Sequence, residues 1–177
     1  MGSVMDMIKK RSSIRAHTDQ SIKEKDLEKL VEAANWAPSA GNTYCWQVII
    51  VQNRDLLRKI QFVSPGMLGN PAAAIVLCID REKALKRVGT KGKELFCVMD
   101  IAHAAQNICL EATELGIGSC CIMSFNPDAV AELLDLPEGF TADYIISLGY
   151  PAGTRVKTKK RSVGETVLKW FGEDKDE

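Results

Sequence analysis

The chain has 177 residues, with 23 basic and 23 acidic side chains and therefore no formal net charge at pH 7. This length suits one domain with a single core, and the balanced charge excludes a general electrostatic field for nucleic acid. No apolar run has the length of a membrane span. The start of the chain lacks the apolar region of a signal peptide, so we expect a cytoplasmic protein.

The first informative segment is Arg11-Ser12-Ser13-Ile14-Arg15, which follows the apolar-periodic stretch 4–8. Planar guanidinium groups suit a phosphate, and serine hydroxyls and amides complete its cradle. One arginine could hold a phosphate while the other holds the polar edge of a ring. The alternative is a solvated basic helix end, because cations are favourable at a helix carboxyl terminus.

A helix and a strand are predicted next. Ser21-Ile22-Lys23-Glu24 resembles a capping box that opens a helix, because Leu27, Leu30 and Ala34 recur on one face of the residues that follow. The β-branched run 47–51 is typical of a buried strand.

The loop between them, from Ala37 to Trp46, has turn-forming residues and small polar side chains. Pro38 ends the helix, Gly41 permits unusual dihedral angles, and Ser39 and Asn42 supply compact donors and acceptors. Such a loop favours a binding role. The same residue types are also the ordinary residues of any turn.

The helix expected from about Leu95 to Leu115 carries small residues that let another helix approach closely, and Gly116 ends it. His103 lies among apolar positions, which indicates a packed or interface histidine rather than an acid catalyst. The small residues are Ala102, Ala104, Ala105 and Ala112.

Six cysteines are spread over predicted strands and helices. Adjacent Cys120 and Cys121 lie in a strand, where neighbouring side chains point to opposite faces. There is no C-x-x-C pair and there are only two histidines, so we expect buried reduced thiols and neither a disulfide scaffold nor a metal site.

The carboxyl-terminal part begins after the apolar run 144–148 and the turn 149–153. From Arg155 to Arg161 every residue except Val156 and Thr158 is cationic, which suits a single phosphate better than a duplex. Residues 173–177 are mostly acidic. The alternation of helical and strand patterns predicts one α+β domain over residues 1–177.

In this order and spacing, the segments from about Met5 to Arg161 resemble the nitroreductase family of FMN-dependent oxidoreductases. Residues 11–15 are similar to its Arg-x-Ser-x-Arg/Lys flavin motif, and residues 37–42 to its A-P-S-x-x-N loop, with Trp46 at the end of that motif. Four further parts complete the pattern. They are the start of the long central helix (100–107), its end with the next strand (114–120), and residues 148–151 and 159–161.

The resemblance implies a nitroreductase-like α+β fold, with a central, mainly antiparallel β-sheet flanked by helices, in an intertwined homodimer. The FMN sites would lie at the subunit boundary, with the small-faced central helix in the interface. Residues 163–177 would form an arm and an acidic tail, and Val163 to Phe171 would pack on the partner.

The resemblance also implies site residues. Arg11 and Ser13 would hold the FMN phosphate, and Arg15 would lie near N1 and O2, where a cation stabilises the charge of reduced flavin. The partner's copy of the 37–42 loop would reach the ring, and the backbone at 122–124 would cover it and offer an amide to N5. The implied cofactor-binding set is Arg11, Ser12, Ser13, Arg15, Pro38, Ser39, Asn42, Ile122, Met123, Ser124, Lys159 and Arg161, with no metal and no catalytic side chain.

The implied activity is hydride transfer from NADH or NADPH to tightly bound FMN and then electron transfer to a nitroaromatic, quinone or similar small-molecule acceptor, by a ping-pong mechanism. Two alternatives stay open. One is another flavin reaction on this fold, such as activated-alkene reduction or flavin fragmentation. The other is a non-catalytic flavin-binding protein or a thiol redox sensor built around Cys45 and Cys120.

Two positions depart from the family pattern. Tyr44-Cys45 stands where the family has Gln-Pro, so the flavin contact of that Gln is not assigned to Tyr44. We interpret Cys45 as a small apolar filler rather than a redox-sensitive thiol. Ser124 replaces a common Gly and adds a side chain close to the ring.

Overall fold

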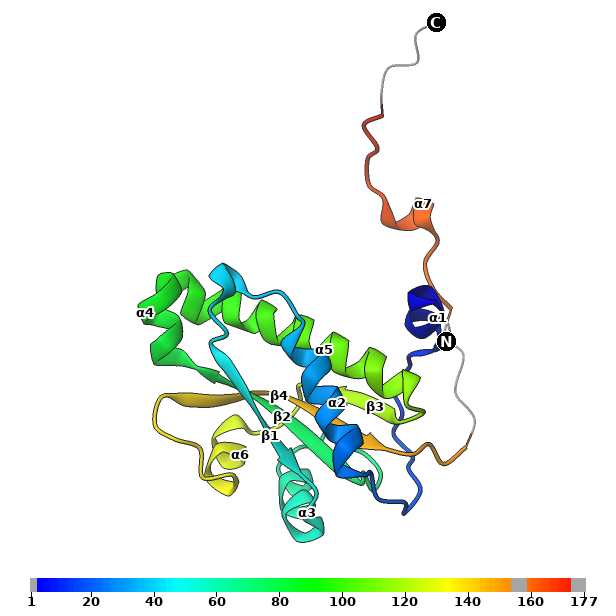
Figure 1. Cartoon of the computed structure of the whole chain (residues 1–177), viewed down its shortest axis with the longest axis vertical. Coiled ribbons are helices and arrows are strands. Elements are labelled where there is room, and N and C mark those ends of the chain that lie inside the picture. Colours follow the sequence, from blue (N-terminus) through cyan, green and yellow to red (C-terminus); the bar gives the residue numbers. More distant parts are fainter. Residues whose placement is uncertain (1–2, 154–158, 173–177) are drawn as a thin grey trace, which may run out of the picture.

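The structure is a computed structural model that describes residues 3–153 and 159–172. Its centre is a four-stranded antiparallel sheet in the order β1-β2-β4-β3, with helices on both faces (Figure 1). This confirms the predicted α+β class and the antiparallel sheet. The strands are β1 (Trp46–Val51), β2 (Ala73–Asp80), β3 (Gly118–Ile122) and β4 (Phe140–Gly149).

The described helices are α1 (Val4–Lys10), α2 (Glu24–Asn35), η1 (Ala40–Asn42), α3 (Arg54–Phe62), α4 (Arg81–Lys91), the π-helical segment η2 (Gly92–Phe96), α5 (Cys97–Glu114), α6 (Pro127–Leu133) and α7 (Val163–Thr166). None of them combines the length and apolarity that crossing a membrane requires.

Strand β2 shows why the sheet is covered on both sides. Ile75 and Leu77 pack in one core with α2 and α5, whereas Val76 and Cys78 pack in a second core with α3 and α6. Successive side chains of a strand point to opposite faces, so a continuous apolar run requires cover on both.

The small residues of α5 serve the chain's own core. Ala104, Ala105 and Ala112 are all buried there, with Ala105 only 1% exposed. Close packing of α5 on α2 is also marked by the Asn107 side chain, which donates to the carbonyl of Ala33 at 3.1 Å. Assigning these three alanines to a subunit interface was therefore wrong. Their neighbours Ala102 and His103 are exposed on the outer face of α5, so His103 is not packed within the chain.

The predicted capping box at Ser21 was also wrong. Helix α2 begins at Glu24 with Lys23 as its N-cap, and no side chain caps it. Ile22 holds the segment before the helix in position instead. Its side chain is buried, and its carbonyl accepts a hydrogen bond from the Gln52 side chain at 2.9 Å. Tertiary contacts thus overrode the local motif.

The cysteines follow the prediction with one exception. All six are free, and five are buried, but Cys121 is exposed. Cys45 is fully buried, as expected of a small apolar filler. Within the described ranges, no group of three or more His, Cys, Asp or Glu side chains could hold a metal ion.

Beyond β4, the described residues 159–172 form an arm that leaves the body of the molecule (Figure 1). Ser162 and Glu165 cap its single turn of helix, α7. The apolar side chains that follow have almost no cover in the single chain: Leu168 is 100% exposed, Trp170 79% and Phe171 84%. Arg155 and Lys157 of the basic cluster and the acidic tail 173–177 lie outside the described residues.

Candidate functional site

The cationic segment 11–15 is attached to the edge of the sheet. The amide of Ile14 donates to the carbonyl of Ser119 on β3 at 2.9 Å. Farther along, Thr18 donates to the carbonyl of Tyr150 at 2.8 Å and Ala152 to that of Ala16 at 3.0 Å. These backbone hydrogen bonds fix the carboxyl-terminal part of the segment and the residues that follow it, so the chain at Arg15 has a defined position.

Two glycines allow the segment to lie in this position. A Cβ at Gly118 would lie 2.7 Å from the Ile14 side chain, and a Cβ at Gly69 would lie 2.1 Å from the carbonyl oxygen of Arg15. Gly69 also has a φ of +75°, which L side chains rarely adopt. Sequence reasoning missed Gly69, although the turn-forming residues around it signal a loop.

Three of the predicted residues meet at β3. Burial raises the pKa of the Cys120 thiol, and Arg15 and Ser13 beside it lower that pKa. Arg11 interacts electrostatically with Cys121 on the same strand and with Cys109 on α5. Two positive charges and a hydroxyl therefore lie along one short strand.

Ser12 is placed differently. Together with Ile14 and Lys10 it lines a separate hollow of about 220 Å³. Thr113 and residues 116–119 line the same hollow. The structure therefore does not group Ser12 with the other members of its motif.

The segment Ile122-Met123-Ser124 follows directly after Cys121. Ile122 is buried in the core, whereas Met123 is 61% exposed. The amide of Gly66 donates to the carbonyl of Ser124 at 3.0 Å. The loop that contains Gly66 and Gly69 thus contacts both this segment and Arg15, and brings them to one side of the molecule.

The loop 38–44 is held by a buried carboxylate. Both oxygens of Asp100 on α5 accept the amide of Ala40, each at 3.1 Å, and Asp100 is only 4% exposed. Burial raises the pKa of the Asp100 carboxyl above its ordinary 3.8, although the Ala40 amide opposes this. Sequence reasoning missed Asp100, whose signal is an acidic residue on an otherwise apolar helix face.

The backbone of this loop is unusual, as its glycine predicted. Gly41 has a φ of 58°, and Asn42 and Tyr44 also have positive φ. The Ser39 hydroxyl accepts the amide of Tyr44 at 3.4 Å. The Tyr44 ring lies against Trp46, with 6.5 Å between ring centroids, so in this chain it packs beside the residue that ends the motif.

The two groups of predicted residues lie at opposite ends of α5 (Figure 1). Asp100, which holds the loop, is in the first turn of the helix, whereas Cys109, which lies near Arg11, follows nine residues later. At 1.5 Å per residue this separates them by roughly 13 Å along the axis. One chain therefore does not bring Pro38, Ser39 and Asn42 to Arg11, Ser13 and Arg15.

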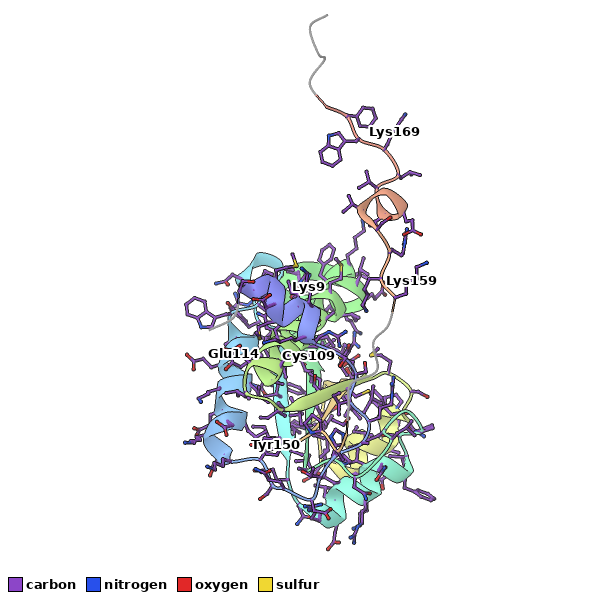
Figure 2. All side chains as sticks on the ribbon, turned by 90° about the vertical axis from the view of Figure 1, so that its right-hand side faces the viewer. Lys9, Cys109, Glu114, Tyr150, Lys159 and Lys169 are labelled. Carbon is purple, nitrogen blue, oxygen red and sulfur yellow. The ribbon has the colours of Figure 1, made fainter. Side chains whose placement is uncertain are left out.

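Lys159 and Arg161 lie at the start of the arm. Figure 1 shows this part of the arm on the same side of the molecule as α1, and Figure 2 shows Lys159 at the base of the arm. The guanidinium of Arg161 donates to the carbonyl of Glu165 in its own helical turn. Lys159 is thus at the same end of the molecule as the cationic segment.

Comparison with known proteins gives a consistent result. The family model described as "Nitroreductase family" matches residues 8–64 and 59–150. A protein of Archaeoglobus fulgidus provisionally named NADH dehydrogenase/NAD(P)H nitroreductase is 38% identical over 157 residues, which cover 85% of this chain and 87% of the relative. The FMN reductase (NAD(P)H) of Bacillus subtilis is 28% identical, with 94% of this chain and 73% of the relative covered.

Among solved structures, the FMN-dependent nitroreductase of Clostridium difficile superposes with a TM-score of 0.76 at 28% identity. The match covers 88% of this chain and 91% of that one.

Proposed function

Because the chain belongs to the nitroreductase family, we propose that it is an FMN-dependent oxidoreductase that uses NADH or NADPH to reduce a nitroaromatic, a quinone or a similar small molecule. The observation that carries this proposal is the arrangement of Arg11, Ser13 and Arg15 along β3. The names of the relatives from B. subtilis and C. difficile support FMN as the cofactor.

The donor set suits FMN. Arg11 and the Ser13 hydroxyl provide charge-assisted and neutral hydrogen bonds to a phosphate, and Lys159 at the base of the arm adds charge from the same end. Arg15, which contacts the same loop as the 122–124 segment, would face the polar edge of the flavin ring. When bound, FMN supplies the hydride chemistry, and the protein supplies binding, orientation and electrostatics.

We further propose that the site is shared between two copies of the chain. Asp100 holds the loop 38–44 in place, yet the loop lies far from Arg11 of the same chain. This is expected if the loop serves the partner's flavin. The exposed Leu168, Trp170 and Phe171 of the arm provide apolar surface for a partner, because patches of this kind mark interaction sites. Ala102 and His103 on α5 are also available to a partner.

The test is spectroscopic. The purified protein is expected to be yellow or to become yellow on loading with FMN, and its visible band should bleach with NADH or NADPH under anaerobic conditions. Addition of a nitroaromatic or quinone should restore the band. A protein that cannot be loaded with FMN would refute the proposal, and a loaded protein whose colour persists under excess NAD(P)H would indicate binding without turnover.

A further inference from the structure

Two cysteines from different elements meet at the edge of the sheet. The sulfur of Cys109 on α5 lies 3.6 Å from the sulfur of Cys121 on β3, and both thiols are free. A disulfide requires about 2.05 Å between the sulfurs, so the two atoms would need to approach by only about 1.5 Å.

The two thiols have different surroundings. Cys109 on α5 is 1% exposed and lies in the hydrophobic core of the protein, whereas Cys121 on β3 is exposed. An attacking oxidant can therefore reach Cys121, and the buried Cys109 is positioned behind it as the second thiol.

The charges and hydrogen bonds around the pair favour a thiolate at Cys121. The hydrogen bond from the Cys109 thiol lowers the pKa of Cys121, burial opposes this, and the Tyr144 hydroxyl from β4 and the Arg11 charge lower it further. The same shared hydrogen bond and burial raise the pKa of Cys109, against the opposing effects of Ser119 and Arg11. The shared hydrogen bond thus favours the thiolate form at the exposed sulfur, Cys121.

The remaining buried thiols contrast with this pair. Burial raises the pKa of Cys78 to about 12 and that of Cys97 to about 11. Because the thiolate is the reactive form, these residues are expected to be inert. Cys45 and Cys120, the sensor pair considered from the sequence, are both buried.

We propose that Cys109 and Cys121 form a dithiol–disulfide redox site that reacts with hydroperoxides, independently of whether the flavin reaction proposed above takes place. First, the Cys121 sulfur attacks a peroxide oxygen. An S–O bond forms, the O–O bond breaks, and the leaving alkoxide or hydroxide takes a proton from water.

Next, the Cys109 sulfur attacks the Cys121 sulfur. The S–S bond forms, the S–O bond breaks, and the leaving hydroxide takes the Cys109 proton and departs as water. The two thiols lose two electrons, and the peroxide becomes an alcohol or water plus a second water. An external dithiol restores the pair by thiol–disulfide exchange.

The experiment uses the full chain as purified, with any flavin it holds, after reduction and removal of the reductant. It is treated with a few equivalents of hydrogen peroxide, followed by thiol counting and peptide mass spectrometry. We expect the loss of two of the six thiols, a cross-linked peptide pair containing Cys109 and Cys121, and full recovery with dithiothreitol.

Three variants complete the design. Cys109→Ser should stop at a sulfenic acid on Cys121 that dimedone traps, Cys121→Ser should lose no thiols to a cross-link, and the matched control Cys120→Ser should still form the disulfide. Unchanged thiol content in the parent protein, a cross-link between other cysteines, or a persistent sulfenic acid when both cysteines are present would each overturn the proposal. Because mapping of the parent protein decides the matter, the result does not depend on how well the variants fold.

Discussion

The cationic segment 11–15 and the loop 38–44 are both held firmly, but by different means. The first is bonded backbone to backbone to the edge strand β3, so the sheet itself sets its position. The second depends on one buried carboxylate, Asp100, which accepts the amide of Ala40.

This difference fits our proposal that the two groups are halves of a site shared by two chains, because they do not meet within one chain. The cationic half, residues 11–15, lies against β3 at its own end of α5. The loop half is ordered in advance and, in our proposal, meets its counterpart only in a partner. Five predictions test this comparison.

The largest effect is expected from removing the arm. Deletion of residues 162–177 removes Trp170 and Phe171, and large interface side chains commonly contribute about 2 kcal/mol or more each, so dimerisation should weaken at least roughly a thousandfold. FMN should be lost with the dimer if the site is shared.

Size-exclusion chromatography with detection at the flavin absorbance band measures both properties in one run. The control removes only the acidic residues 173–177 and should remain a dimer. A folded monomer that keeps full FMN occupancy would show that the site is built within one chain.

Arg11→Ala should weaken FMN binding by about ten- to a hundredfold, because a charge-assisted hydrogen bond contributes about 1.5–3 kcal/mol. The exposed Lys160 of the basic cluster gives the matched control, since Lys160→Ala should change affinity much less. Fluorescence titration of the apoprotein with FMN provides both values. Equal affinity of Arg11→Ala and the parent protein would remove Arg11 from the phosphate site.

Asp100→Ala should destabilise the protein by about 1–3 kcal/mol, since it leaves the Ala40 amide without its acceptor. Asp100→Asn keeps an acceptor and should cost less. Urea unfolding at pH 7 compares the three proteins, and equal stabilities of the Ala variant and the parent would contradict this role for Asp100.

A comparison of the parent protein with Asp100→Asn also tests the pKa of Asp100. Because burial raises this pKa in the folded state above 3.8, folding favours the protonated carboxyl. As the pH falls through the raised pKa, the parent should therefore gain stability relative to Asp100→Asn, and the gain should be complete below about 3.8. A difference that is constant from pH 7 to pH 3.5 would rule out the raised pKa.

Arg15→Gln should have the smallest effect. Phosphate binding should remain largely intact, while the reduction potential of bound FMN should fall by about 20–40 mV, which corresponds to roughly 1–2 kcal/mol for two electrons. Equilibration with a reference dye measures this potential. An unchanged potential would remove Arg15 from the N1/O2 side of the flavin.

A substitution on α5 that probes the interface must lie outside the chain's own core, and Ala105 does not. A charge at that position would enter the chain's own core, so Ala105→Glu would unfold the monomer rather than separate subunits. The exposed Ala102 on the same helix avoids this ambiguity.

The sequence by itself determined the elements whose side chains repeat with a clear period. The β-branched run of β1, the long helix α5 and the turn at Gly41 could all be predicted, because local patterning and backbone sterics specify them. The order of motifs likewise identified the family and the candidate residues from Arg11 to Arg161.

Only the tertiary structure decided which of these residues meet. It assigned Ala104 and Ala105 to the core, placed Ser12 in a hollow of its own, and brought Cys109 to Cys121 across a helix and a strand. Such contacts depend on how whole elements pack, and a helix face looks the same in sequence whether it covers its own sheet or a partner. For that reason burial, and with it the reactivity of each thiol and carboxylate, required the folded chain.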